Sequence, residues 1–259
     1  MSITFLIWSC FWNFWGLTPT LDLIWEAPGF VAEEVVFPEC GQLKRAVTLR
    51  SDEIPDHFYE GVQVLHEKGI SVKCSIEAEI KDVEEFAEQA GELLRYYEID
   101  GVEVVFREEI SEELIYACQK VLGDKLSCAI PVSLIEKYGE TITKIEPYLS
   151  QIIVFDFLKK KCDFEEEMRR LWDLGVLGKK ITFSLQVGPH RSGKGVTTIA
   201  DCKMAADVVK KYGLYGVQLD SFQRDTDQRE GVDPGPSAKQ TGLPKGLFAQ
   251  VVCKTLLGS

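Results

Sequence analysis

Carboxylates and one arginine stand at the ends of short apolar runs along this chain. They are Glu77, Glu79, Arg107, Asp156 and Asp220. Neighbouring carboxylates can act as a general acid and base, and a carboxylate beside a guanidinium can bind a polar ligand. Either chemistry requires the apolar runs to end at one place in the fold.

The apolar runs alternate with helical stretches from residue 56 onward. Runs typical of strands lie at 70–76, 102–106, 126–131, 151–157, 180–187 and 217–219. Helical stretches lie at 56–68, 82–97, 111–122, 134–145, 164–174, 199–212 and 247–256. The stretch 82–97 shows the clearest apolar face, because its apolar residues recur at three- and four-residue steps. Ser111 has the type and position of a helix N-cap.

Strict strand and helix alternation predicts a parallel sheet covered by helices. Residues 3–9 supply a seventh strand, and an eighth lies between residues 20 and 50, where 34–37 and 45–49 compete. Eight such units in 259 residues fit a (β/α)8 TIM barrel, a single domain over residues 1–259. An open doubly wound sheet is the alternative. In a barrel the C-terminal strand ends carry function, which gathers the charged residues above at one mouth.

Four segments carry a resemblance to a known family. VKCSIEAE, YEIDGVEVVF, IIVFDF and GVQLDSF follow one another along the chain. Together they resemble glycoside hydrolase family 18, the chitinases and chitinase-like lectins, whose fourth barrel strand carries D-G-x-D-x-D-x-E. Asp100 and Gly101 match the start of that motif, and Glu103 stands at its first inner Asp. Val105 replaces the second inner Asp, and Arg107 replaces the catalytic Glu.

These replacements decide what the resemblance implies for activity. In the family the Glu protonates the leaving oxygen, and the neighbouring Asp orients the sugar's acetamido group as an internal nucleophile. Val105 has no group for that task, and Arg107 stays protonated at any useful pH. We therefore predict a catalytically inactive, chitinase-like pseudoenzyme. Carbohydrate binding, as in a lectin, or another interaction is its expected role.

Other substitutions weaken sugar recognition as the family performs it. Phe155 replaces a tyrosine whose hydroxyl would hold the acetamido oxygen, and Asp220 replaces the usual stacking Trp. Trp8 is a candidate replacement stacking surface, although packing in the core is the favoured interpretation. The alternatives are a glycosidase or other hydrolase that uses Glu79 or Asp156 or Asp220, and a structural or storage barrel without a ligand.

The fourth strand also predicts a charge inside the barrel. Alternation places Glu103, Val105 and Arg107 on the interior face of the strand. A buried Glu103 requires a partner, and Lys73 on the adjacent strand is the expected one. A structural ion pair is the favoured interpretation, and a catalytic Lys–Glu pair is the alternative.

The loop GPHRSGKG, residues 188–195, follows a strand and precedes a helix, as a phosphate-binding loop does. It ends in Gly195 where Ser or Thr would ligand magnesium, which argues against nucleotide hydrolysis. His190, Arg191 and Lys194 are candidates for a simpler anion site, since the loop after the seventh strand often binds phosphate in barrels. A mobile basic loop is the favoured alternative.

Composition limits the partners and the compartment. A net charge of −12 argues against nucleic acid and anionic membranes as partners, and leaves an oligosaccharide or other small ligand at the barrel mouth. None of the eight cysteines forms a C-x-x-C pair, so we expect no metal and no cofactor, and mainly reduced, buried thiols. The N-terminal apolar run has no preceding basic residue and is too short to span a membrane. These features favour the cytoplasm, with secretion and disulfides as the alternative.

Overall fold

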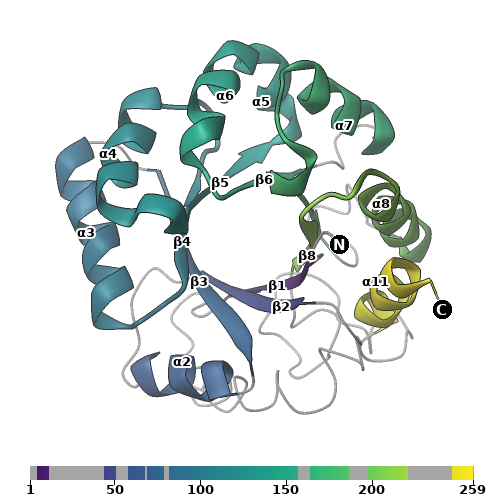
Figure 1. Ribbon diagram of the computed structural model, residues 1–259, viewed down its shortest axis with the longest axis horizontal. Coiled ribbons are helices and arrows are strands. Elements are labelled where there is room, and N and C mark those ends of the chain that lie inside the picture. Colours follow the sequence, from purple (N-terminus) through teal and green to yellow (C-terminus); the bar gives the residue numbers. More distant parts are fainter. Residues whose placement is uncertain are drawn as a thin grey trace.

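Eight parallel strands form a closed barrel in sequence order, which confirms the predicted fold class. The computed structural model describes residues 5–11, 44–50, 58–67, 69–78, 82–156, 164–186, 198–220 and 247–258. The strands are β1 (Phe5–Phe11), β2 (Lys44–Arg50), β3 (Ile70–Glu77), β4 (Gly101–Val105), β5 (Leu126–Pro131), β6 (Gln151–Phe155), β7 (Ile181–Gln186) and β8 (Gly216–Asp220). Figure 1 looks along the barrel, with the strands as its inner ring.

Helices surround the barrel as an outer ring (Figure 1). They are α2 (Phe58–Glu67), α3 (Val83–Tyr96), α4 (Glu112–Leu122), α5 (Val132–Lys137), α6 (Gly139–Ile145), α7 (Phe164–Asp173), α8 (Ile199–Tyr212) and α11 (Leu247–Leu257). Short 3-10 turns at Gly123–Lys125, Glu146–Tyr148 and Gly178–Lys180 precede strands or the residues leading to them. No helix among the described residues is long and apolar enough to cross a membrane.

Capping side chains explain where several helices begin. Ser111 accepts a hydrogen bond from the Leu114 backbone N–H at 3.1 Å, so the predicted N-cap is confirmed. Asp82 caps α3 in the same way, and Thr198 begins α8 with a reciprocal capping box. Gly213 ends α8 in the left-handed conformation that glycine adopts without strain.

One helix differs from the sequence prediction, and one open alternative is resolved. The helix expected over residues 134–145 is two helices, α5 and α6, because Tyr138 between them has non-helical backbone angles (φ −116°, ψ 26°). Of the two segments considered for the second strand, the later one forms β2, which pairs with both β1 and β3. The rejected segment 34–37 lies outside the described residues.

The barrel has two separate apolar clusters. Val102, Val104 and Phe106 point outward from the β4 region and join the main core between strands and helices. Val105 points inward and packs with Ala129 and Ile153 in a second cluster. The predicted alternation along the fourth strand is therefore confirmed, and it fixes which residues line the barrel interior.

Gly101 begins β4 where the neighbouring backbone leaves no room for a side chain. A Cβ at this position would lie 2.7 Å from the Lys125 carbonyl oxygen. We expect Gly101→Ala to lower the free energy of unfolding by about 1–3 kcal/mol, as overpacking does. Urea denaturation measures the change.

Gly139→Ala is the matched control for that substitution. Its Cβ would meet only the end of the Leu174 side chain, at 2.8 Å, which can move aside. Alanine is also favoured over glycine in a helix. Equal losses in both variants would show that the Lys125 carbonyl is not the obstacle at Gly101.

Among the five cysteines whose side chains the structure describes, four agree with the expected reduced thiols. Cys118, Cys128 and Cys202 are buried and form no disulfide, and Cys74 is half-buried and forms none either. Cys253 is disulfide-bonded, so the expectation of a reduced thiol is wrong for this residue. Sequence spacing cannot reveal such a bond, because pairing requires two Cα atoms within about 7 Å in the fold.

Candidate functional site

Arg107 stands just beyond β4 at the C-terminal mouth of the barrel. Its Nε and Nη2 atoms both donate to Glu77 Oε1, at 3.1 and 2.5 Å. Its guanidinium carbon lies 5.4 Å from the centre of the Phe155 ring. The side chains of Arg107 and Glu77 keep 51% and 58% of their area exposed, so the pair is accessible to a ligand.

The Arg107 and Glu77 pair has unused hydrogen-bonding capacity. Both described bonds converge on one carboxylate oxygen. Within the described part of the chain, Arg107 Nη1 donates no bond and Glu77 Oε2 accepts none. The mouth therefore presents a charged donor beside a charged acceptor.

The side chains below the Arg107 and Glu77 pair form an apolar floor inside the barrel. Val105, which the sequence comparison aligned with the acetamido-orienting Asp of family 18, is 2% exposed. It packs with Ala129 and Ile153, and Phe155 contacts the same cluster from the mouth. Aliphatic and aromatic side chains thus fill the barrel interior next to the mouth.

Asp156 follows β6 and is half-buried. Its φ of 62° places it in the left-handed region, which aspartate tolerates better than most residues. This backbone turn ends the strand next to Phe155 at the same mouth.

Several predicted site residues are only partly described or lie outside the described residues. Glu79 and the anion-loop candidates His190, Arg191 and Lys194 lie outside them, so their roles stay predictions. Trp8 and Asp220 are placed by backbone only: Trp8 pairs with Leu219, and Asp220 ends β8.

Glu103 and Lys73 occupy the barrel interior as predicted, but their described hydrogen bonds go to other partners. Glu103 is 1% exposed and accepts from Ser75 Oγ at 3.0 Å. Lys73 Nζ donates to Gln151 Oε1 at 2.6 Å and lies 5.8 Å from the Tyr215 ring. Burial lowers the pKa of Lys73 to about 8, against the opposing fields of the Glu103 and Asp100 carboxylates.

The matching start of the family motif has a structural role here. Asp100 accepts from the Val72 backbone N–H at 2.7 Å, and its carboxylate lies 2.9 Å from His66 Nε2. These contacts hold the segment before β4 against β3 and α2. Asp100 and Gly101 therefore lie at the strand's start, away from the mouth.

Sequence reasoning missed four polar residues inside the barrel, all at most 1% exposed: Ser127, Gln151, Thr182 and Gln218. Gln151 Nε2 donates to Thr182 Oγ1 at 2.6 Å, which extends the chain of bonds from Lys73. These residues could have been found from the sequence, because each is a polar residue at an inward-facing position of an otherwise apolar strand.

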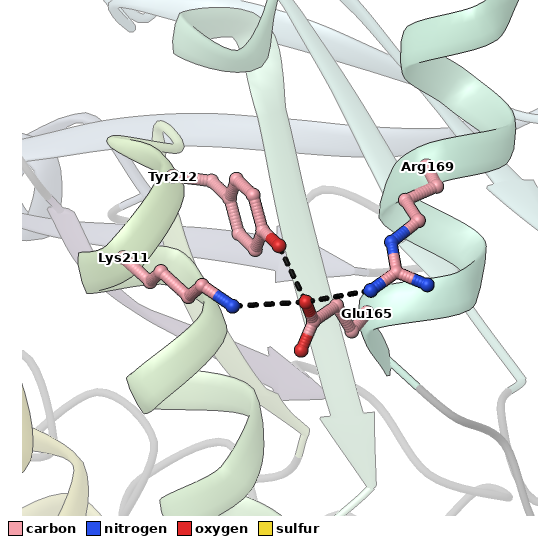
Figure 2. Close-up of polar contacts among 4 residues, drawn as sticks. All are labelled: Glu165, Arg169, Lys211 and Tyr212. Atoms are coloured by element: carbon pink, nitrogen blue, oxygen red, sulfur yellow. Dashed lines mark hydrogen bonds and ion pairs between the residues drawn. The ribbon is translucent and has the colours of Figure 1, made fainter.

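A second charged cluster joins α7 to α8 on the helix ring (Figure 2). Glu165 Oε1 accepts from Tyr212 at 2.5 Å, from Lys211 at 2.9 Å and from Arg169 at 2.9 Å. The hydrogen bond from Tyr212, followed by that from Lys211, lowers the pKa of Glu165 to about 2. All three donors are used to fix one carboxylate between two helices, which is a structural arrangement.

The described side chain that ends the β4 region at the mouth is an arginine, not a carboxylic acid. An arginine holds a positive charge and donates hydrogen bonds without giving up a proton. Among the described residues, no three His, Cys, Asp or Glu side chains gather in a group that could hold a metal ion.

Solved structures of chitinases share the barrel fold of this chain. No protein-family model and no curated protein matches the chain. Active domain 2 of a thermostable chitinase from Pyrococcus furiosus, complexed with chito-oligosaccharides, matches with a TM-score of 0.70 and 15% identity over 99% of this chain and 96% of that one.

Two further structures give similar values. A family 18 chitinase from Pseudoalteromonas aurantia matches with a TM-score of 0.68 and 12% identity, over 98% of this chain and 100% of that chain. An endo-β-N-acetylglucosaminidase from Cordyceps militaris matches with a TM-score of 0.65 and 11% identity, over 98% and 91%. The chain has the (β/α)8 barrel fold of family 18 chitinases.

Proposed function

We propose that this protein is a chitinase-like barrel that binds a saccharide at its mouth and does not hydrolyse it. The observation that carries the proposal is Arg107, which stands in the position of the catalytic acid and is ion-paired with Glu77. A guanidinium in that position binds and orients oxygen atoms but transfers no proton to a leaving group.

The apolar floor supports the loss of hydrolysis. Substrate-assisted hydrolysis needs a carboxylate to orient the acetamido group, and Val105 offers none. Its packing with Ala129, Ile153 and Phe155 replaces polar groups of the family site by buried apolar contacts.

The Arg107 and Glu77 pair supports binding. Adjacent sugar hydroxyls both donate and accept hydrogen bonds, so they complement the available Nη1 donor and Oε2 acceptor. The chitinase domain from Pyrococcus furiosus was solved with chito-oligosaccharides, which makes these sugars the appropriate first probe.

Titration calorimetry with chitotetraose tests the binding proposal. We expect Arg107→Ala to weaken binding about tenfold or more, because losing charge-assisted hydrogen bonds costs about 1.5–3 kcal/mol. Arg170→Ala is the matched control, since this arginine is also ion-paired and exposed but lies on α7. Equal affinities in the two variants, or no heat with the unmodified protein, would reject the binding of this saccharide at Arg107.

A further inference from the structure

The polar residues inside the barrel fall into two groups. One group is fully connected: Gln151 uses its amide oxygen with Lys73 and its amide nitrogen with Thr182. Ser75 is likewise bonded to Glu103. These bonds link Lys73 and Ser75 of β3, Glu103 of β4, Gln151 of β6 and Thr182 of β7.

Gln218 on β8 forms the contrasting group. Its side chain is 0% exposed, and neither amide atom, Nε2 or Oε1, has a hydrogen-bond partner among the described residues. It shares the inward parity of β8, because Gly216 at the same parity pairs with the interior residue Thr182 of β7. The amide is therefore directed into the barrel and not toward the helices.

The strand neighbours of Gln218 do not satisfy its amide. On β7 it pairs in register with Ser184, and on β1 with Ile7, which has no polar side chain. Ser184 is 5% exposed, so its hydroxyl is buried on the strand next to the amide. Two adjacent inward-facing side chains thus bring an amide and a hydroxyl to one buried place.

A buried amide without a hydrogen-bond partner destabilises the fold unless another molecule supplies that partner. Buried polar atoms in native proteins almost always have a partner, from the protein or from an ordered molecule. The amide offers one donor group and one acceptor, and the hydroxyl offers both. An ion of either sign would leave part of this set unsatisfied, so the complementary occupant is uncharged and both donates and accepts.

We propose that Gln218 and Ser184 form a buried site inside the barrel for a small uncharged molecule that donates and accepts hydrogen bonds. Water has this chemistry, and so does a small alcohol or amide. The site is closed to bulk solvent, because Gln218 and Ser184 are 0% and 5% exposed. This site is separate from the proposed saccharide site, since it involves neither Arg107 nor Glu77.

Gln218→Met tests the site by stability, because methionine keeps the shape and removes the amide. Gln151→Met is the matched control, a buried glutamine whose two amide atoms both have described partners. If Gln218 is bound, we expect both substitutions to lower Tm by at least about 2–4 °C, the shift typical of one lost buried interaction in a chain of this size. A Tm that rises in Gln218→Met alone would overturn the proposal. It would mean that the buried Gln218 amide has no hydrogen-bond partner and destabilises the native protein.

A measurement on the unmodified protein avoids any dependence on folding of the variant. Selective ¹⁵N-glutamine labelling, with Gln218→Met as the assignment reference, permits nuclear Overhauser measurements from the Gln218 side-chain NH₂ protons. A cross-peak to water identifies water as the occupant, and a cross-peak to a non-protein, non-water resonance identifies a small organic molecule. If the NH₂ protons contact protein protons only, the site does not exist.

Discussion

The intact protein is expected to release no product from aryl chitobiosides above a buffer blank. Arg107 cannot donate the proton that the leaving oxygen needs, and loss of a general acid alone costs about two to four orders of magnitude in rate. The absence of an acetamido-orienting carboxylate at Val105 removes the internal nucleophile's support as well. A fluorogenic chitobioside assay, with an active family 18 chitinase as positive control, measures this difference.

A double variant that restores the two family residues tests whether they alone account for the missing hydrolysis. We expect Val105→Asp with Arg107→Glu to give little turnover, because Phe155 still lacks the hydroxyl that holds the acetamido oxygen. The new aspartate would also enter the apolar cluster of Ala129 and Ile153. Robust turnover by the unmodified protein that disappears in Glu79→Gln or Asp156→Asn would instead establish a relocated acid and reject the non-hydrolytic proposal.

Lys73 is expected to make stability depend on pH between about 8 and 10.5. Its pKa is about 8 in the folded protein and near the ordinary 10.5 when unfolded, so the unfolded chain binds more protons in this window. Stability therefore rises as pH increases through it, by about 3 kcal/mol for a pKa difference of this size. Below pH 8 the lysine is charged in both states, and the desolvation cost is fully present.

Comparison with Lys73→Met isolates this effect from tyrosines and cysteines that titrate in the same range. The unfolding free energy of the unmodified protein, minus that of the variant, should increase from pH 8 to pH 10.5 in urea titrations. A difference that stays constant with pH would show that Lys73 is solvated. In Glu103→Gln the rise should begin at a lower pH, because the carboxylate's field raises the pKa of Lys73.

Alternation along the strands made the fold and part of the mouth predictable. The inward parity of Val105 and the meeting of Arg107 with Glu77 follow from two adjacent parallel strands that end at one level. The helix break at Tyr138 was not predictable in the same way, because the apolar spacing continues across it. Periodicity reports which face a residue occupies and does not report a local change of backbone angle.

The hydrogen bond from Lys73 to Gln151 could not be derived from the neighbours of Lys73 on the adjacent strand. A lysine side chain is long enough to reach across the interior, and it bonds with Gln151, 78 residues away. Register gives the nearest neighbours along a sheet, whereas a closed barrel also brings non-adjacent strands within reach of one another. The roles of Glu79 and of the loop with His190 stay predictions, as does the division of the chain into one domain.

Closure of the sheet restricts how another protein can bind this one. Each of the eight described strands is paired on both sides, so the barrel offers no free strand edge to which an extended peptide could add. Recognition by strand addition, and the edge-to-edge association that leads open sheets to aggregate, both require such an edge. A protein partner of the barrel must therefore contact helix faces or the segments that connect strands and helices. It would recognise side chains there, because none of the described strands has backbone free to pair.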